Sequence, residues 1–152
     1  MTRKGQPLAD IVDKATRSRM MAGIKGKNTK PEIQVRKALH AAGFRFRLHD
    51  KKLPGKPDIV LRKYKTVVFV HGCFWHGHEC EKFRWPKTRR AFWRKKILAN
   101  RKRDSTAVRD LEKTGWVTVA IWECNSVSVN KLIAMLHTMR KTGGIHPKKT
   151  FS

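Results

Sequence analysis

The chain has 152 residues, of which 39% are hydrophobic, and this suits one domain with a hydrophobic core. Its 36 Lys and Arg residues against 11 Asp and Glu residues give a net charge of +25, which favours nucleic acid over a membrane surface or an acidic protein as partner. No stretch approaches the roughly 20 apolar residues of a transmembrane helix, and MTRKGQPLAD lacks the apolar core of a signal peptide. We therefore expect a cytoplasmic protein that associates with the nucleoid and not with a membrane.

The two ends of the chain lack hydrophobic periodicity. Residues 1–9 and 143–152 contain basic residues, Gly and Pro, which predicts tails around one domain at residues 10–142. The domain begins with a predicted helix at residues 10–24 that carries Arg17, Arg19, Met20 and Met21. The two methionines could anchor the core or form an apolar wedge, and the sequence leaves this open.

Helices and strands alternate in the rest of the domain. Thr29-Lys30-Pro31-Glu32 has the form of a capping box, which predicts a second helix that ends at Gly43. Alternating or β-branched apolar residues predict strands at residues 44–48, 58–61, 65–70 and 116–122. A long basic helix is predicted at residues 88–114 and an amphipathic helix at 126–141. The pattern predicts the α/β class, with a mixed central sheet flanked by helices.

Asp58 is a candidate metal ligand because it begins one predicted strand, while the next strand runs into His71. Many nucleases hold Mg²⁺ with an aspartate so placed, since carboxylate and backbone oxygens suit this hard cation. The alternative is that Pro57-Asp58 only serves the turn before the strand. The scarcity of acids and the nearby histidine favour the metal site.

A second candidate metal site follows in residues 71–80, HGCFWHGHEC. The three cysteines of the chain are an odd number, and cytosolic thiols stay reduced, so metal ligation is a better hypothesis than disulfides. His78 and Cys80 would point the same way in an extended stretch, and Cys124 and Asp104 could complete a tetrahedral zinc site. Spacing alone also allows His76 and Cys73, or free cysteines beside surface histidines.

Aromatic residues are interleaved with cations in this region. Phe74, Trp75, Trp85 and Trp93 could each lie in the core, but Phe74 and Trp75 would face opposite ways in an extended loop. Aromatic side chains among cations stack on bases or wedge between base steps. A DNA contact is therefore the alternative to a core position.

These residues together resemble the very short patch repair (Vsr) DNA mismatch endonucleases from about Asp10 to Lys141. The motifs that carry the resemblance are Asp13-Lys14-Ala15-Thr16-Arg17-Ser18, Leu53-Pro54-Gly55-Lys56-Pro57-Asp58, Val70 through His76, Phe92-Trp93, Arg103-Asp104 and Trp122-Glu123-Cys124. The pair of HGCFWH with an upstream LPGKPD is highly specific. The resemblance implies a single-domain, restriction-endonuclease-like (PD-(D/E)XK-type) fold with a structural zinc site. It also implies Mg²⁺-dependent nicking of duplex DNA beside the T of a T:G mismatch left by deamination of 5-methylcytosine.

The resemblance also implies roles for individual residues. Asp58 and the backbone carbonyl of Val70 would hold Mg²⁺, although Val70 stands where the relative compared has Thr. His71 and His76 would act as acid, base or water-organising groups, supported by Glu32. The structural zinc ligands would be His78, Cys80, Asp104 and Cys124. The DNA-binding or intercalating residues would be Phe74, Trp75, Trp93 and Met21, with Arg17 and Arg19.

Two other functions stay open at this point. One is a zinc-containing DNA-binding module that does not cleave DNA, in which Asp58 and His71 are structural. The other is a nuclease of the same fold that prefers another mismatch or sequence context. A monomer acting on mismatched double-stranded DNA is the expected working form.

Overall fold

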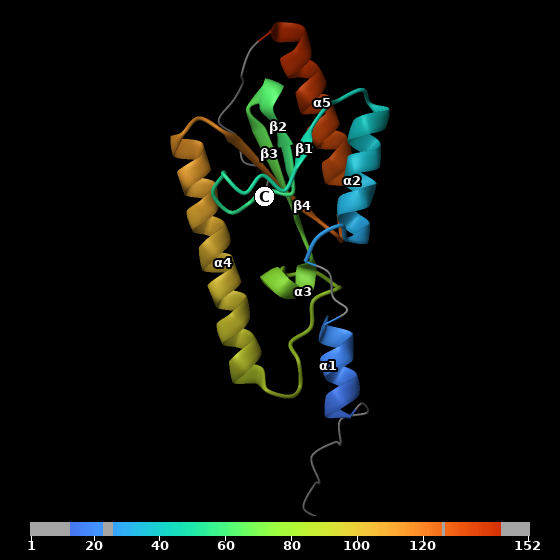
Figure 1. The fold of residues 1–152 in the computed structure, drawn as a ribbon, viewed down its shortest axis with the longest axis vertical. Coiled ribbons are helices and arrows are strands. Elements are labelled where there is room, and N and C mark those ends of the chain that lie inside the picture. The colour runs from blue at the N-terminus through green and yellow to red at the C-terminus, as the bar shows by residue number, and fades with distance from the viewer. Residues whose placement is uncertain (1–12, 23–25, 126, 144–152) are drawn as a thin grey trace, which may run out of the picture.

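A four-stranded sheet of mixed direction organises the computed structural model, which describes residues 13–22, 26–125 and 127–143 (Figure 1). The strands follow the order β1 (Arg47–Leu48), β2 (Ile59–Leu61), β3 (Thr66–His71) and β4 (Val117–Trp122). The pairs β1–β2 and β2–β3 are antiparallel, and the pair β3–β4 is parallel, with Val70 opposite Ile121. The mixed α/β arrangement expected from the sequence is confirmed.

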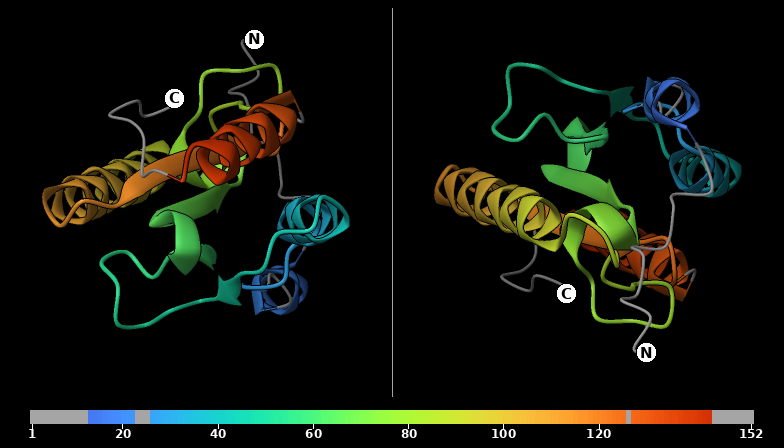
Figure 2. Two further views of the ribbon diagram at one scale, coloured as in Figure 1. Left: turned by 90° about the horizontal axis from the view of Figure 1, so that it is seen from above. Right: turned by 90° about the horizontal axis from the view of Figure 1, so that it is seen from below.

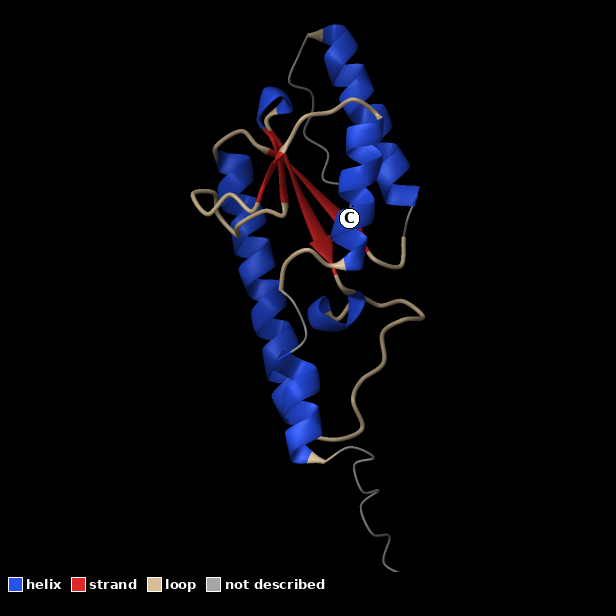
Figure 3. Ribbon diagram, turned by 45° about the vertical axis from the view of Figure 1, so that its right-hand side comes forward, coloured by secondary structure: helices blue, strands red, loops and turns tan. Residues whose placement is uncertain are grey.

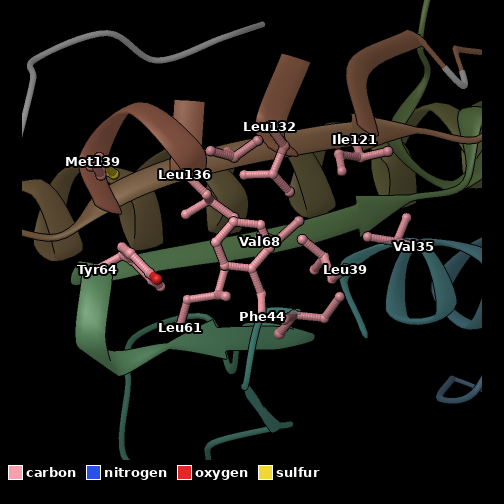
Figure 4. Packing of buried hydrophobic residues seen from close by; sticks show 12 residues of the cluster. Val35, Leu39, Phe44, Leu61, Tyr64, Val68, Ile121, Leu132, Leu136 and Met139 are labelled. Atoms are coloured by element: carbon pink, nitrogen blue, oxygen red, sulfur yellow. The ribbon is translucent and has the colours of Figure 1, made fainter. Parts of the chain in front are cut away.

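Alternation along β3 divides the core into two clusters. Val68 faces a cluster built with α2 (Lys30–Ala41) and α5 (Val127–Thr142), which include Leu39 and Leu136 (Figure 4). Val67 and Phe69 face the other way, towards Leu111 of α4 (Arg90–Lys113). The views from above and below accordingly show α4 and α2 on opposite sides of the strands (Figure 2). Both faces of the sheet are therefore covered, which explains its continuous apolar strands.

Three shorter helices complete the described part of the chain. They are α1 (Lys14–Ala22), the 3₁₀ turn η1 (Arg62–Tyr64) between β2 and β3, and α3 (Cys73–His76). The helix α3 lies beyond the ends of β3 and β4 and beside α4 (Figure 3). No helix among the described residues is long and apolar enough to cross a membrane.

Two local expectations differ from the structure. Residues 44–48 were expected to form a strand, but only Arg47–Leu48 pair, because Phe44 is buried in the core cluster beside Tyr64 and His137. Residues 73–76 were expected to be extended, but they form one helical turn that ends at Gly77 in the left-handed conformation. The two expected tails, residues 1–9 and 143–152, lie outside the described part of the chain except for Gly143.

Candidate active site and metal centre

Asp58 lies beside the end of β3 because β2 and β3 are antiparallel. Its backbone amide donates to the Val68 carbonyl at 3.1 Å, and its Oδ2 accepts a hydrogen bond from the Val70 amide at 2.7 Å. The sequence pattern that placed a carboxylate near the end of the next strand is thus confirmed in its geometry. Asp58 and Val70, the two residues expected to hold Mg²⁺, are brought together.

A buried polar network adjoins Asp58. Glu32 is 3% exposed, and its Oε2 accepts from Arg36 Nη2 at 2.7 Å and from the Asn28 amide at 3.0 Å. The same Arg36 nitrogen lies 3.0 Å from Nε2 of His49, whose Nδ1 lies 3.9 Å from Oδ1 of Asp58. Ligand atoms of Glu32, His49 and Asp58 all lie within 4.8 Å of one another. Glu32 therefore contacts His49, and not His71 and His76, which it was expected to support.

Sequence reasoning missed Arg36 and His49. Arg36 lies one helical turn after Glu32, where an acid and a base on one helix face attract each other. His49 directly follows β1, and its amide donates to the Asp58 carbonyl at 3.2 Å across the β1–β2 pair. A pairing of the strand at residue 48 with the strand at residue 59 would have revealed His49, but the sequence does not specify that pairing.

The surroundings of Asp58 make its negative charge costly in the absence of a cation. Burial raises the pKa of Asp58 to about 6, although the hydrogen bond from the Val70 amide acts to lower this pKa. The Glu32 carboxylate raises this pKa further, while Arg36 and His76 lower it. A nearby cation would compensate the burial and favour the carboxylate form.

His71, His76 and Asp104 form a second cluster, whose ligand atoms also lie within 4.8 Å of one another. His76 Nδ1 lies 2.5 Å from Asp104 Oδ2, so the carboxylate accepts a hydrogen bond from the Nδ1–H of His76. The ring of His71 lies 4.0 Å from that of His76, measured between centroids. Burial, together with His76, lowers the pKa of His71 to about 4, which leaves His71 uncharged at neutral pH.

A third cluster, the cysteine–histidine cluster, consists of Cys73, His78, Cys80 and Cys124. Its four ligand atoms lie within 4.8 Å of one another, and Cys124 Sγ is 3.4 Å from His78 Nδ1. A tetrahedral zinc ion with Zn–S bonds of about 2.3 Å would separate two sulfur ligands by about 3.8 Å. Three thiols and one imidazole therefore form a set that suits zinc.

Asp104, which was expected among the zinc ligands, lies outside this set, and Cys73 lies within it. The reason is the helical turn of α3, which turns the buried Cys73 towards His78 and leaves His76 facing Asp104 on α4. Burial raises the pKa of the Cys73 thiol to about 12, so its thiolate requires a cation in contact with the sulfur.

The indole of Trp122 contacts both the His71–His76–Asp104 cluster and the cysteine–histidine cluster. It stacks on His78 with ring centroids 4.1 Å apart and planes at 9°, and it lies 4.9 Å from the ring of His71. Trp122 is the last residue of β4, opposite His71 in the parallel pair. It was missed as a site residue because a tryptophan at the end of an apolar strand resembles any other core residue.

An exposed aromatic group surrounds α3. Phe74, Trp75 and Trp93 contact one another edge to face, with centroids 5.2 to 5.9 Å apart, and each of them is only partly buried. Residues Phe83, Trp85 and Phe92 extend the group. The three side chains expected to enter DNA are therefore adjacent and reachable, and none of them belongs to the core.

Side chains of the helix α4 hold α3 in place by donating hydrogen bonds to backbone carbonyls of α3. Asn100 Nδ2 donates to the Trp75 carbonyl at 2.8 Å, and Arg101 Nε donates to the His76 carbonyl at 2.9 Å. Arg101 also donates to the carbonyl of Gly77. These bonds satisfy the last carbonyls of a turn too short to be stable alone.

The remaining expected DNA contacts lie on α1. Arg19 is exposed, and its Nη2 donates to Thr16 Oγ1 at 3.2 Å. The side chains of Arg17 and Met21 lie outside the described part of the structure, so their expected roles stay predictions.

Comparison with known proteins identifies the family. The family model described as DNA mismatch endonuclease Vsr matches residues 9–82. A type II nicking enzyme of Neisseria meningitidis is 51% identical over 117 residues, which cover 77% of this chain and 84% of the relative. A type II nicking enzyme of Xanthomonas oryzae is 43% identical over 132 residues, which cover 87% of this chain and 97% of the relative.

The DNA mismatch endonuclease Vsr of Escherichia coli is 44% identical over 117 residues, which cover 77% of this chain and 75% of that enzyme. Asp58, His71, His76, Phe74 and Trp75 fall within the matched segment at residues 9–82, and Trp93 and Asp104 follow it in the chain. The chain therefore belongs to the Vsr family of DNA mismatch endonucleases, and it is a DNA endonuclease.

Proposed function

We propose that this endonuclease nicks one strand of duplex DNA beside the T of a T:G mismatch, with Mg²⁺ as cofactor, and so begins very short patch repair of deaminated 5-methylcytosine. The observation that carries the proposal is the meeting of Asp58, the His71–His76–Asp104 cluster and the exposed aromatic group at one end of the sheet. The restriction-endonuclease-like fold expected from the resemblance belongs to the same proposal, and the mixed sheet with helices on both faces supports it.

The residues around Asp58 suit Mg²⁺. Asp58 and the carbonyl of Val70 would supply the oxygen ligands that this cation prefers, and a bound cation would offset the burial that raises the pKa of Asp58 to about 6. Bound there, Mg²⁺ supplies positive charge that stabilises the phosphoryl oxygens and polarises the attacking water. Glu32 supports this site through Arg36 and His49.

The histidines supply proton transfer. Hydrolysis forms a bond between a water oxygen and phosphorus, breaks one P–O ester bond, and moves a proton from the water to a base and another to the leaving oxygen. Asp104 fixes the proton of His76 on Nδ1, so Nε2 of that ring is available to exchange protons with the water or the leaving oxygen. The uncharged, buried ring of His71 packs against His76 and keeps it oriented.

The aromatic group and the basic surface provide recognition. Phe74, Trp75 and Trp93 would enter the base stack beside the mismatch, and a mismatched pair is cheaper to unstack than a matched one. Met21 would enter from the other groove, with Arg17 and Arg19 near it on α1. The basic helix α4 would contact the phosphate backbone without reading its sequence.

The cysteine–histidine cluster would bind one structural zinc ion through Cys73, His78, Cys80 and Cys124. Cys73 is the first residue of α3, so this ion would fix the turn that carries the aromatic group and His76. The enzyme is expected to act on mismatched double-stranded DNA as a monomer.

Cleavage of mismatched duplexes tests the proposal. Wild-type protein is expected to nick the T strand of a T:G duplex with Mg²⁺, and to leave it intact with EDTA or when the duplex is fully paired. Asp58→Asn is expected to bind the same duplex and lower the nicking rate at least about 10³-fold, because the carboxylate charge at the metal site is lost. Asp110→Asn, on the far part of α4, is the matched control and retains the wild-type rate.

The other functions predict different outcomes. A protein that binds DNA but cuts none of a panel of mismatches would be the DNA-binding module, and the proposal would be wrong. Cleavage of another mismatch in preference to T:G, across randomised flanking bases, would retain the endonuclease but replace its substrate.

A further inference from the structure

We infer that Arg36 and His49 are positioning residues for Asp58, and that Arg36 holds His49 in the tautomer whose Nδ1–H faces the Asp58 carboxyl group. The inference rests on the proposed role of Asp58 as the Mg²⁺ ligand. It adds two residues, contributed by α2 and by the turn after β1, that the LPGKPD and HGCFWH motifs do not contain.

The guanidinium of Arg36 is held rigidly on the first turns of α2. Its Nη2 donates to Glu32 Oε2 at 2.7 Å, and its Nη1 donates to Asn28 Oδ1 at 2.7 Å. Glu32 is itself fixed, because its carboxylate accepts from the Thr29 hydroxyl at 3.3 Å and from the Asn28 amide at 3.0 Å. The capping box that starts α2 therefore also orients the cation that faces His49.

The contact of Arg36 with His49 determines which ring nitrogen carries the proton. A guanidinium has only donors, so the His49 Nε2 that lies 3.0 Å from Arg36 Nη2 must accept the hydrogen bond. An imidazole that accepts at Nε2 carries its single proton on Nδ1. A doubly protonated ring would place one N–H against another at this distance.

The Nδ1–H of His49 completes the surroundings of the Asp58 carboxyl group. Oδ2 of Asp58 is held by the Val70 amide at 2.7 Å, and Oδ1 faces His49 Nδ1 at 3.9 Å. This separation exceeds a hydrogen bond, so the Nδ1–H of His49 acts on Oδ1 through electrostatic attraction. One lone pair of Oδ1 then faces His49 and the other is free for a cation. With both oxygens placed, the carboxyl group meets the cation in one orientation.

The backbone supports the same arrangement. The His49 amide donates to the Asp58 carbonyl at 3.2 Å, so the two residues cannot move apart without breaking the β1–β2 pair. His49 has a φ of 48°, in the left-handed region that Asn and His occupy more readily than most residues. Asn is therefore a tolerated substitute at this position.

Direct metal binding by His49 is the competing interpretation, since Glu32, His49 and Asp58 could themselves surround an ion. Arg36 argues against it, because the guanidinium already occupies Glu32 Oε2 and His49 Nε2. The two interpretations predict opposite effects of Arg36→Met. Loss of a positioning residue weakens metal binding at Asp58, whereas removal of a blocking cation strengthens it.

The first test uses ¹⁵N NMR of the histidine rings in the zinc-loaded protein without DNA. We expect the His49 ring to show the Nδ1–H tautomer, and Arg36→Met to shift it towards a mixture or the Nε2–H form. A wild-type ring in the Nε2–H form, or a ring that Arg36→Met does not change, would overturn the inference. Because no cleavage is measured, this result is independent of the proposed substrate.

The second test compares two replacements of the ring. In His49→Asn the side-chain NH₂ lies near the position of Nδ1 and can replace the donor that faces Asp58. In His49→Gln the NH₂ lies near the position of Nε2 and cannot replace that donor. Mn²⁺ binding is followed by electron paramagnetic resonance. The Mn²⁺ that Asp58→Asn still binds measures the ions bound at other sites. We expect His49→Asn to bind Mn²⁺ within about threefold of wild type, and His49→Gln and Arg36→Met to bind it about 10-fold or more weakly, as for other residues that orient a metal ligand.

The Mg²⁺ concentration for half-maximal nicking should shift in the same order, and thermal unfolding of each variant shows whether it is folded. Equal Mn²⁺ binding by His49→Asn and His49→Gln, or tighter binding by Arg36→Met, would contradict the positioning role. If no variant or wild type nicked any duplex while Mn²⁺ binding followed the expected order, the proposed function would fail and the inference would stand.

Discussion

At the scale of single residues, the direction of each candidate side chain decides which cluster it joins. The motifs identified Asp58, His71, His76, His78, Cys80 and Cys124 as candidates, and the structure places all six in clusters that could act on phosphate or metal. Asp104 was expected as the fourth zinc ligand, but the helical turn at residues 73–76 brings Cys73, and not Asp104, to the other three expected ligands. His49 was missed because the pairing of β1 with β2 brings it to Asp58, and Arg36 because the packing of α2 brings it to His49.

The separation of Asp104 from the cysteine–histidine cluster leads to a prediction about zinc and activity. Asp104→Asn keeps the shape of the side chain but removes the charge that fixes the proton of His76 on Nδ1. We expect it to retain about one zinc ion per chain and to lower the nicking rate by about 10²–10⁴, the usual effect of a lost orienting carboxylate or general acid–base group. Zinc is measured by atomic absorption, and nicking under single-turnover conditions.

Cys73→Ala is the paired variant. It removes one of four metal ligands, so we expect loss of zinc together with a lower temperature of unfolding. Loss of zinc from Asp104→Asn, with zinc retained in Cys73→Ala, would restore Asp104 as the fourth ligand.

At the scale of elements, long periodic segments were predictable and the shortest ones were not. The strands β3 and β4 and the helix α4 begin and end within one or two residues of their expected bounds, because β-branched runs and a helix closed by Gly115 leave clear signals. The single turn of α3 depends on Asn100 and Arg101, which are more than 20 residues away in the chain. A local pattern contains no trace of such partners.

The end of α3 gives a prediction about stability. Gly77 has a φ of 59°, and a Cβ placed on it would lie 2.6 Å from Ile97 Cγ2. We expect Gly77→Ala to lower the free energy of unfolding by roughly 2–4 kcal/mol, as the sum of left-handed backbone strain and overpacking. Chemical denaturation measures the loss.

Gly143→Ala is the matched control for this change. Gly143 also has a positive φ, 62°, but no atom lies within 4 Å of the added Cβ. We expect it to cost about 1–2 kcal/mol, since only the backbone strain remains. Equal losses for the two variants would show that contact with α4 does not constrain the turn.

At the scale of the whole molecule, the charge of +25 is predicted to govern affinity for DNA. If the protein neutralises 6 to 10 phosphates, its affinity for a duplex should fall by about 10³–10⁵ between 50 and 200 mM salt, because binding releases condensed counterions. Fluorescence anisotropy with matched and mismatched duplexes measures this dependence, and circular dichroism at each salt concentration checks that the fold is unchanged. An affinity that changes less than tenfold would assign binding to the aromatic group and not to charge.

The alternation of ligands through α3 limits how this protein can vary in length. His71 and His76 belong to one cluster, while Cys73, His78 and Cys80 belong to the cysteine–histidine cluster, so the ligands from His71 to His78 alternate between the two. One inserted residue within the turn would rotate the side chains that follow it in the helix by about 100° and move them out of their clusters. Residues 71–80 can therefore accept some substitutions but no insertion or deletion, whereas the largely exposed segment 81–89 can change in length without altering either cluster.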